Sequence, residues 1–218
     1  MRIVIAGGHG QIALRLERLL SKGGHEVAGI IRTSEQAADL RAAGAEPVVL
    51  DLESASVDAV AAVLRGADAA VFAAGAGPAS GVARKDTVDR AAAVLFADAA
   101  EAAGVRRFLV VSAMAADARR EGDGEFDAYL RAKGAADDDV RSRPGLDWTI
   151  LRPGILTDDA GTGLVELKAS TGRAPVPRDD VAAVLAELLE TPATAGLTLE
   201  LISGSVPVPV AVKDIAGN

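Results

Sequence analysis

A glycine-rich turn directly after the first apolar segment is the feature that most constrains the fold of this chain. Residues 3–6 are apolar and of strand length, the turn Gly-Gly-His-Gly follows at residues 7–10, and an amphipathic helical pattern begins near Ile12. Strand, glycine turn and helix in this order are typical of a βαβ unit that binds a dinucleotide. The glycines allow the backbone to approach a pyrophosphate, which the helix N-terminus would stabilise with its free N–H groups and dipole.

The rest of the chain continues this alternation of strand and helix patterns. Six apolar runs of strand length lie at residues 3–6, 27–31, 47–50, 69–72, 108–111 and 148–151. Helical patterns separate them at residues 12–22, 35–43, 57–64, 86–103 and 129–141. Only 3% of the residues are aromatic, so the core must consist of Ala, Val, Leu and Ile, which suits buried parallel strands. We therefore expect an α/β fold with a doubly wound parallel sheet, the Rossmann fold.

The regular rhythm loosens after Pro153. A polar, Gly-rich stretch covers residues 157–163, followed by a helical pattern near 179–190 and a strand pattern near 198–202. A chain of 218 residues with one alternating pattern is expected to form one domain. We expect a single domain over residues 1–218, in which residues 157–218 contribute a small C-terminal lobe on the substrate side.

Composition and charge exclude several classes of function. The formal net charge is −8, which disfavours binding to nucleic acid or to anionic lipid. The chain has no cysteine and two isolated histidines, so we expect no metal site. No apolar run reaches the roughly 18 residues of a membrane helix, and residues 1–5 have the pattern of a strand, so we expect a cytoplasmic protein. The scarcity of aromatic anchors favours a monomer or weak homodimer.

The end of the second predicted strand carries information about the cofactor. Proteins that select NAD place an acidic residue about 20 residues after the glycine turn, where it binds the ribose hydroxyls. This chain has Arg32 near that position, and a guanidinium can pair with a 2′-phosphate. We therefore expect NADP, with NAD as the alternative, although Arg32 could also be an ordinary surface residue. Asp51 and Leu52 follow the third strand and are expected to contact the adenine, unless Asp51 caps the next helix.

A Ser, Tyr and Lys constellation gives the chain a candidate chemistry. Ser112 ends the fifth predicted strand, and Tyr129, the only tyrosine, lies four residues before Lys133 on the next predicted helix. That spacing puts Tyr129 and Lys133 on one helix face. We expect the ammonium of Lys133 to lower the pKa of the Tyr129 phenol, so that Tyr129 exchanges a proton with a substrate oxygen oriented by Ser112. A purely structural tyrosine is the alternative.

These motifs together resemble an atypical, NAD(P)-binding short-chain dehydrogenase/reductase, of the branch related to nucleoside-diphosphate-sugar epimerases and NmrA-like proteins. The resemblance covers nearly the whole chain. It rests on the segments at residues 5–12, 31–32, 50–52, 73–75 and 111–113, on Tyr129 with Lys133, and on the segments at 148–154, 156–159 and 161–163.

The resemblance implies a seven-stranded Rossmann-like sheet, with a dinucleotide across the carboxyl ends of the strands and hydride transfer by Ser112, Tyr129 and Lys133. It also implies that Lys133 binds the nicotinamide ribose. The residues expected to bind the cofactor are Gly7, Gly8, His9, Gly10, Gln11, Ile12, Arg32, Asp51, Leu52, Ala73, Ala74, Gly75, Ser112, Lys133, Pro153, Gly154 and Ile155.

Two departures from the family pattern bear on the activity. Alanine replaces the family's asparagine at the end of the fourth strand, and the asparagine that some relatives supply from the central helix is not evident.

We expect an NADP-dependent reductase or dehydrogenase acting on a small carbonyl or alcohol. The alternatives are a non-catalytic NADP-binding sensor and a sugar-nucleotide epimerase or dehydratase. Arg152 could simply pair with a surface carboxylate, and Asp158 and Asp159 could be a solvated acid pair without a catalytic part.

Overall fold

A computed structural model of the chain describes residues 1–77 and 80–217. Its main sheet has the order β11-β8-β10-β6-β5-β4-β1-β2-β3. The seven strands from β10 to β3 are parallel to one another, in agreement with a Rossmann-like fold. They are β1 (Arg2–Ala6), β2 (Glu26–Ile31), β3 (Glu46–Val49), β4 (Ala69–Phe72), β5 (Arg107–Val111), β6 (Asp147–Pro153) and β10 (Leu197–Ser203).

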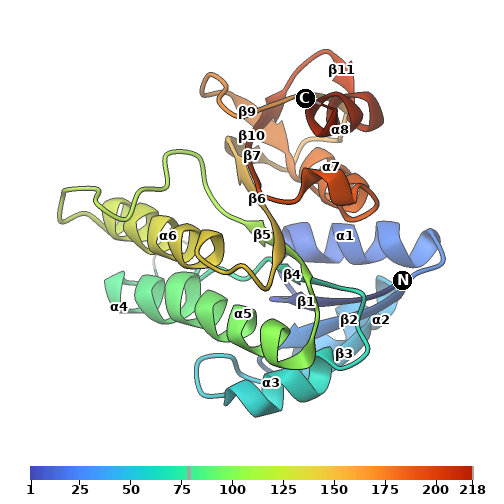
Figure 1. The fold of residues 1–218 in the computed structure, drawn as a ribbon, viewed down its shortest axis with the longest axis vertical. Coiled ribbons are helices and arrows are strands. Elements are labelled where there is room, and N and C mark those ends of the chain that lie inside the picture. The colour runs from blue at the N-terminus through green and yellow to red at the C-terminus, as the bar shows by residue number, and fades with distance from the viewer. Residues whose placement is uncertain (78–79, 218) are drawn as a thin grey trace.

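Helices cover both faces of this sheet (Figure 1). One face carries α1 (Gln11–Lys22), α2 (Ala37–Ala42), α7 (Arg178–Leu189) and α8 (Val208–Ala216). The other carries α3 (Val57–Leu64), α5 (Ala92–Ala103) and α6 (Glu125–Arg141). The predicted doubly wound α/β fold is therefore confirmed. No helix within the described part of the chain is long and apolar enough to cross a membrane.

The two faces have separate hydrophobic cores, and their compositions differ. Leu16, Leu40 and Leu185 belong to the core beneath α1, α2 and α7. The opposite core, beneath α3, α5 and α6, contains the three buried phenylalanines, Phe72, Phe96 and Phe108. Ring centroids 5.7–6.1 Å apart place these rings in contact, so the few aromatic side chains of this alanine-rich protein are concentrated in one layer.

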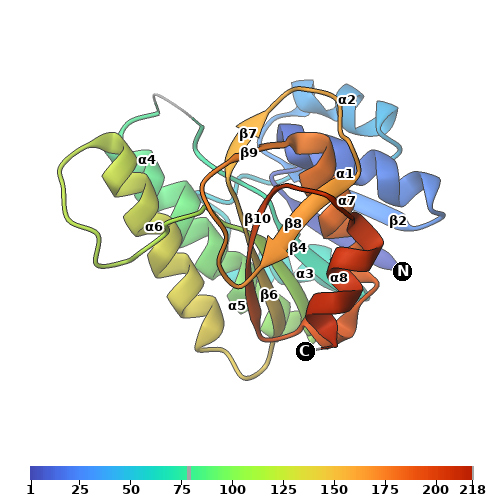
Figure 2. The same ribbon diagram turned by 90° about the horizontal axis from the view of Figure 1, so that it is seen from above.

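The C-terminal segment extends the sheet in the antiparallel sense. Strand β8 (Leu164–Lys168) pairs antiparallel with β10 and with β11 (Val206–Pro207). Strands β7 (Ile155–Thr157) and β9 (Pro175–Pro177) form a separate parallel pair. In Figure 2, β7 and β9 lie above the carboxyl-end side of the main sheet. The sequence predicted β10 and α7 here but missed β7, β8, β9, β11 and α8, because short strands and a helix with prolines near its start give little periodic signal.

Three predicted helices have different boundaries in the structure. The segment expected at 35–43 begins with a 3₁₀ turn, Ser34–Gln36, before α2. The helix expected at 86–103 begins earlier, at Val82, and comprises α4 (Val82–Arg84), a π-helical segment (Lys85–Ala91) and α5. Helix α6 begins at Glu125, one turn before the predicted start, so Tyr129 lies inside the helix and not at its first residue.

Candidate cofactor and active site

The glycine turn between β1 and α1 approaches the end of β4 closely. Gly7 has a φ of 78°, a conformation that favours glycine, and a Cβ at this position would lie 2.6 Å from Cα of Ala74. The N–H of Gly10 donates to the carbonyl of Gly7 at 2.8 Å. Within the described residues no side chain caps the N-terminus of α1, whose first N–H groups therefore face the turn without a helical partner. This geometry fits the pyrophosphate of a dinucleotide.

Gly8, expected to bind the cofactor, lies against β2 in the structure. Its N–H donates to the carbonyl of Ile30 at 2.9 Å, and a Cβ on Gly8 would lie 2.9 Å from Cα of Gly29 and from Oε1 of Glu17. Gly8 thus packs α1 and its turn against β2. The sequence contains a signal for this contact in Gly29, since a glycine inside an apolar strand such as β2 often marks a close backbone approach.

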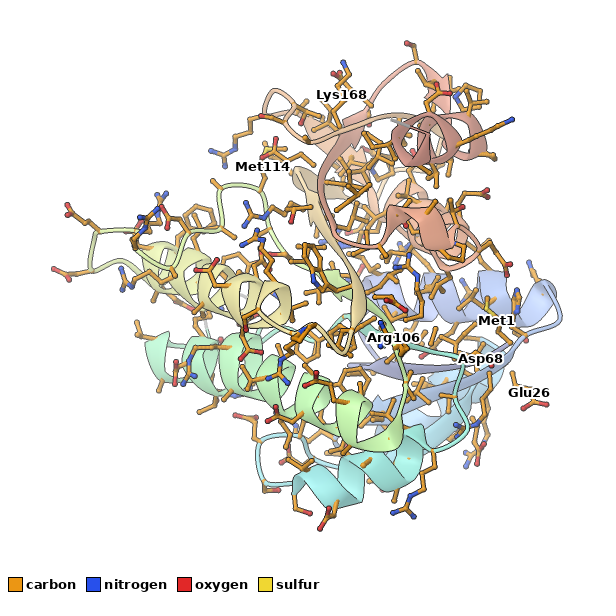
Figure 3. The ribbon with its side chains drawn as sticks, viewed as in Figure 1. Met1, Glu26, Asp68, Arg106, Met114 and Lys168 are labelled. Carbon is orange, nitrogen blue, oxygen red and sulfur yellow. The ribbon has the colours of Figure 1, made fainter. Side chains whose placement is uncertain are left out.

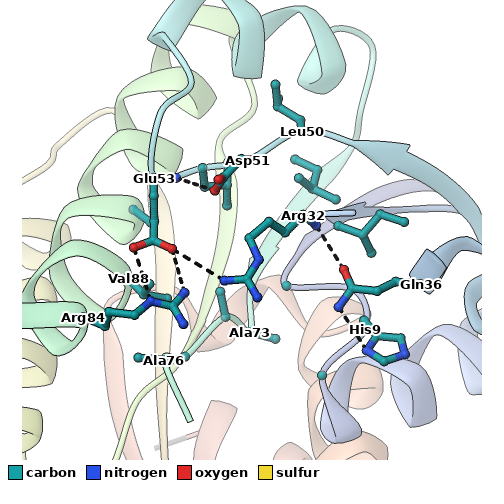
Figure 4. A pocket seen from close by; sticks show the side chains of 18 residues that line it. His9, Arg32, Gln36, Leu50, Asp51, Glu53, Ala73, Ala76, Arg84 and Val88 are labelled. Atoms are coloured by element: carbon teal, nitrogen blue, oxygen red, sulfur yellow. Dashed lines mark hydrogen bonds and ion pairs between the residues drawn. The ribbon is translucent and has the colours of Figure 1, made fainter. Parts of the chain in front are cut away.

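A pocket of about 290 Å³ lies along the carboxyl ends of β1, β2, β3 and β4 (Figure 4). Most of the predicted adenosine and phosphate residues line it, together with several that the sequence did not predict. The predicted residues in its lining are Gly7, His9, Gly10, Arg32, Asp51, Leu52, Ala73, Ala74 and Gly75. The additional ones are Ile30, Ile31, Gln36, Leu50, Glu53, Ala76, Arg84, Val88 and Ala92.

The remaining predicted cofactor residues are not in this lining: Gly8, Gln11, Ile12, Ser112, Lys133, Pro153, Gly154 and Ile155. Pro153 accepts a hydrogen bond from the N–H of Met114 at 3.2 Å, which joins the end of β6 to the loop after β5. Figure 3 shows Met114 on that loop, near the C-terminal elements. Ile155 is half exposed at the start of β7. Ser112, Lys133 and residues 153–155 lie farther along the carboxyl edge, toward β5 and β6, on the side where the resemblance implies the nicotinamide.

Two arginines and one glutamate form the charged edge of the pocket. The guanidinium of Arg84 bonds Oε2 of Glu53 at 2.6 Å, and Nη1 of Arg32 lies 3.8 Å from the same oxygen. The hydroxyl of Thr87 donates to Oε1 of Glu53 at 2.7 Å. These contacts, foremost the hydrogen bond from Arg84, lower the pKa of Glu53. Glu53 lies in a turn after β3 and Arg84 ends the short helix α4, 31 residues later, so no local pattern indicated that they meet Arg32.

His9 and Asp51 have local partners at the pocket. His9 lies between Gln36 and Asp39, with its ring nitrogens 3.2 Å from Nε2 of Gln36 and 2.8 Å from Oδ2 of Asp39. The carboxylate of Asp51 accepts the N–H of Glu53 at 3.0 Å. Ser56, not Asp51, caps α3, so the alternative role of Asp51 as a helix cap is wrong.

Tyr129, Lys133 and Asp137 follow one another at four-residue intervals along α6. Lys133 is buried, and its ammonium donates to the carbonyls of Val111 at 3.1 Å and Ala74 at 3.3 Å. It also lies 3.3 Å from Oδ1 of the fully buried Asp89. Asp89, on the π-helical segment, accepts the N–H of Ala76 at 3.3 Å. The sequence missed Asp89, because residues 84–90 are mostly charged or polar and give no indication that one of their carboxylates is buried.

The pKa of Tyr129 is raised, not lowered as expected. Burial of the phenol has the largest effect and outweighs the opposing effect of Lys133. Lys133 lies 6.0 Å and Lys85 5.7 Å from the centre of the Tyr129 ring. Part of the charge of Lys133 is balanced by Asp89, which itself raises the pKa of the phenol. Tyr129 is therefore a protonated acid at neutral pH.

Ser112 is bonded within the protein interior. Its hydroxyl donates to Oδ2 of Asp137 at 2.9 Å, and the same oxygen accepts two hydrogen bonds from Arg152, at 2.7 and 2.9 Å. Arg152 thus pairs with a buried carboxylate and not with a surface one. Burial raises the pKa of Asp137, against the effect of Arg152. This geometry joins β5, β6 and α6, and it gives Ser112 a partner other than a substrate.

The acidic loop after β7 is held by helices α1 and α7. Asp158 pairs with Arg178 at 2.9 Å and approaches Arg15 at 3.5 Å. The buried Asp180 accepts the N–H groups of Thr162 and Gly163, at 3.1 and 2.8 Å. Asp158 is 61% exposed, so it is a solvated surface acid that forms ion pairs with Arg178 and Arg15.

Comparison with known proteins identifies relatives over the full length of the chain. A family model described as NAD(P)H-binding matches residues 7–192. The "uncharacterized sugar epimerase YhfK" of Bacillus subtilis is 36% identical over 216 residues, which cover 99% of this chain and 100% of that protein. A proposed NAD-dependent epimerase/dehydratase from Bacillus halodurans is 36% identical with a TM-score of 0.89, covering 98% of this chain and 99% of that one. The oxidoreductase ylbE from Lactococcus lactis is 27% identical with a TM-score of 0.86, covering 100% and 98%.

Proposed function

Because the chain belongs to the NAD(P)H-binding family, we propose that it is an NADP-preferring oxidoreductase that transfers a hydride to or from a small carbonyl or alcohol. Membership confirms the resemblance to atypical short-chain dehydrogenases/reductases. The relatives described above are named as oxidoreductases and epimerases. One observation carries the proposal of catalysis. The ammonium of Lys133 bonds the carbonyl of Ala74, a residue of the pocket lining, and so connects the cofactor pocket to the helix face that carries Tyr129.

The cofactor would be held by the residues whose geometry fits it. Gly7 and Gly10 leave space for the pyrophosphate at the N-terminus of α1, and Arg32 offers a guanidinium beside the adenosine end of the pocket. When bound, the reduced nicotinamide supplies the hydride.

Tyr129 would provide the proton. In the direction of reduction, the carbonyl carbon receives the hydride and the carbonyl oxygen receives the proton of the Tyr129 hydroxyl, which solvent then replaces. The raised pKa of Tyr129 keeps this proton on the phenol at neutral pH, which suits reduction better than oxidation. Lys133 would hold this face of α6 against the end of β5 through the carbonyl of Val111, and Ser112 would orient the substrate oxygen once its hydroxyl exchanges the bond to Asp137.

Epimerisation of a sugar is the second candidate, because the Bacillus subtilis relative is named as a sugar epimerase. Such a reaction would use the same tyrosine to remove and return a proton. It differs in outcome, since epimerisation leaves no net change in the oxidation state of the cofactor, whereas the proposed reductase consumes NADPH in proportion to product.

The experiment follows NADPH oxidation with a panel of small aldehydes, ketones and sugars, using the wild-type protein and Tyr129→Phe. The variant should lower kcat about 10²- to 10⁴-fold, because it removes the acid. Calorimetry should show unchanged NADPH affinity, since Tyr129 is not in the pocket lining. Unchanged turnover in Tyr129→Phe would overturn the proposed acid, and isomerisation without NADPH consumption would favour the epimerase.

A further inference from the structure

The charged edge of the pocket contains its own anion between two guanidiniums. Glu53 lies between Arg84, at 2.6 Å, and Arg32, at 3.8 Å (Figure 4). The hydroxyl of Thr87 binds its other oxygen. All three charged side chains are partly exposed to solvent: 52% for Arg32, 37% for Arg84 and 27% for Glu53. They are therefore accessible to a ligand and free to exchange partners.

The charges in the lining also balance. The pocket is lined by two guanidiniums, Arg32 and Arg84, and by two carboxylates, Asp51 and Glu53. A phosphate that entered beside Arg32 would therefore meet a negative charge already bonded to the nearest cations. Like charges at such distances repel, and the repulsion is weakly screened in a partly enclosed pocket.

We propose that Arg84 is the second arm of a 2′-phosphate site formed with Arg32, and that Glu53 is the internal counter-ion that the phosphate displaces. This inference rests on the proposed preference for NADP. A phosphate offers the guanidiniums the same planar pairing as a carboxylate, but with more charge and more acceptor oxygens. Glu53 consequently weakens NADPH binding relative to a neutral side chain, while Arg84 strengthens it.

The test is calorimetric titration of NADPH and NADH into the wild type, Arg84→Ala, Glu53→Gln and the control Arg90→Ala. Arg90 lies on the same helical segment, pairs with Asp86 and is absent from the pocket lining. Arg84→Ala should weaken NADPH about tenfold or more and NADH less than twofold. Glu53→Gln should strengthen NADPH about three- to tenfold and leave NADH unchanged. Arg90→Ala should change neither. Thermal melts of all four proteins exclude general unfolding as the cause.

The outcomes separate the two proposals. If the wild type binds NADH as tightly as NADPH, or binds neither, the proposed NADP preference fails. If the wild type prefers NADPH but the preference is the same in Arg84→Ala, only the second arm is overturned. If Glu53→Gln weakens NADH and leaves NADPH unchanged, Glu53 is a ligand of the ribose hydroxyls, and the counter-ion role is overturned.

Discussion

At the proposed adenosine end of the pocket the charged side chains are partly exposed and bond one another, whereas at the proposed catalytic end they are buried. Arg32, Glu53 and Arg84 can exchange partners with a ligand. Lys133, at 5% exposure, and Asp89, at 0%, are bonded to backbone groups and to each other. The same sheet edge thus combines a charge set suited to binding with one suited to rigid positioning. Mutations at the two ends should therefore change different properties.

The largest effect is expected from Lys133→Met. This change leaves Asp89 as a buried carboxylate without its cation, which costs about 3–5 kcal/mol of unfolding free energy. Urea denaturation measures the loss, with the exposed Lys22→Met as the control. A loss below about 1 kcal/mol would show that the catalytic end is not held by this pair.

Glu17 should make the stability depend on pH. It is fully buried beneath the glycine turn, neither carboxylate oxygen has a hydrogen-bond partner among the described residues, and burial raises its pKa to about 8. The folded state therefore holds a proton that the unfolded state releases above about pH 4.5. Its contribution to stability is complete below that pH, decreases as the pH rises and is lost above about pH 8, at up to about 1.4 kcal/mol per pH unit.

Glu17→Met removes this titration while keeping an unbranched side chain. The variant should gain stability relative to the wild type as the pH rises from 5 to 8 in urea denaturation. The exposed Glu26→Gln should follow the wild type. Parallel pH profiles of stability for the wild type and Glu17→Met would contradict the raised pKa of Glu17.

Arg32→Ala should affect binding without affecting the fold. Loss of a charge-assisted contact to the 2′-phosphate predicts NADPH affinity about 10- to 100-fold weaker and NADH affinity unchanged. The free energy of unfolding should stay within about 0.5 kcal/mol, because the side chain is half exposed. Calorimetry and urea denaturation of one preparation measure both. Equal weakening of NADPH and NADH would contradict the phosphate contact.

The smallest effect is expected at the exposed pair of Arg106 and Asp147, remote from both ends. Its hydrogen bonds measure 2.8 and 3.0 Å, but both side chains are about half exposed. A double-mutant cycle with Arg106→Ala and Asp147→Ala should give a coupling of about 0–1 kcal/mol. A value near that of the buried Lys133–Asp89 pair would remove the distinction between exposed and buried charges.

The sequence predicted the six N-terminal strands and the glycine turn because their signals are local. An apolar run followed by glycine specifies a strand and its turn without knowledge of the rest of the fold. Pairings between distant segments gave no such signal. Arg84 and Glu53 lie 31 residues apart, and Ser112 and Asp137 lie 25 residues apart. The sequence brought Ser112 to the correct edge of the sheet but could not show that Asp137 would bind its hydroxyl.

The expected pKa of Tyr129 failed for a related reason. The four-residue spacing correctly placed Lys133 on the same helix face, but spacing carries no information about burial. Burial of the phenol and the negative charge of Asp89, which comes from another helical segment, together raise the pKa of Tyr129. The sequence shows which side chains lie close together on one helix face. The dielectric environment of those side chains depends on what packs against the helix, which the sequence does not show.

The π-helical segment Lys85–Ala91 has a consequence for changes in chain length. A π-helical turn closes over one residue more than an α-helical turn, so deleting one residue there can restore ordinary helical bonding. Helix α5, which follows the π-helical segment, is held in place by buried residues such as Phe96. The deletion would therefore rotate the residues that precede the π-helical segment about the helix axis. Arg84 would turn by about 100° around the helix axis, away from Glu53. A three-nucleotide deletion could therefore change cofactor selection while leaving every side chain of the glycine turn intact.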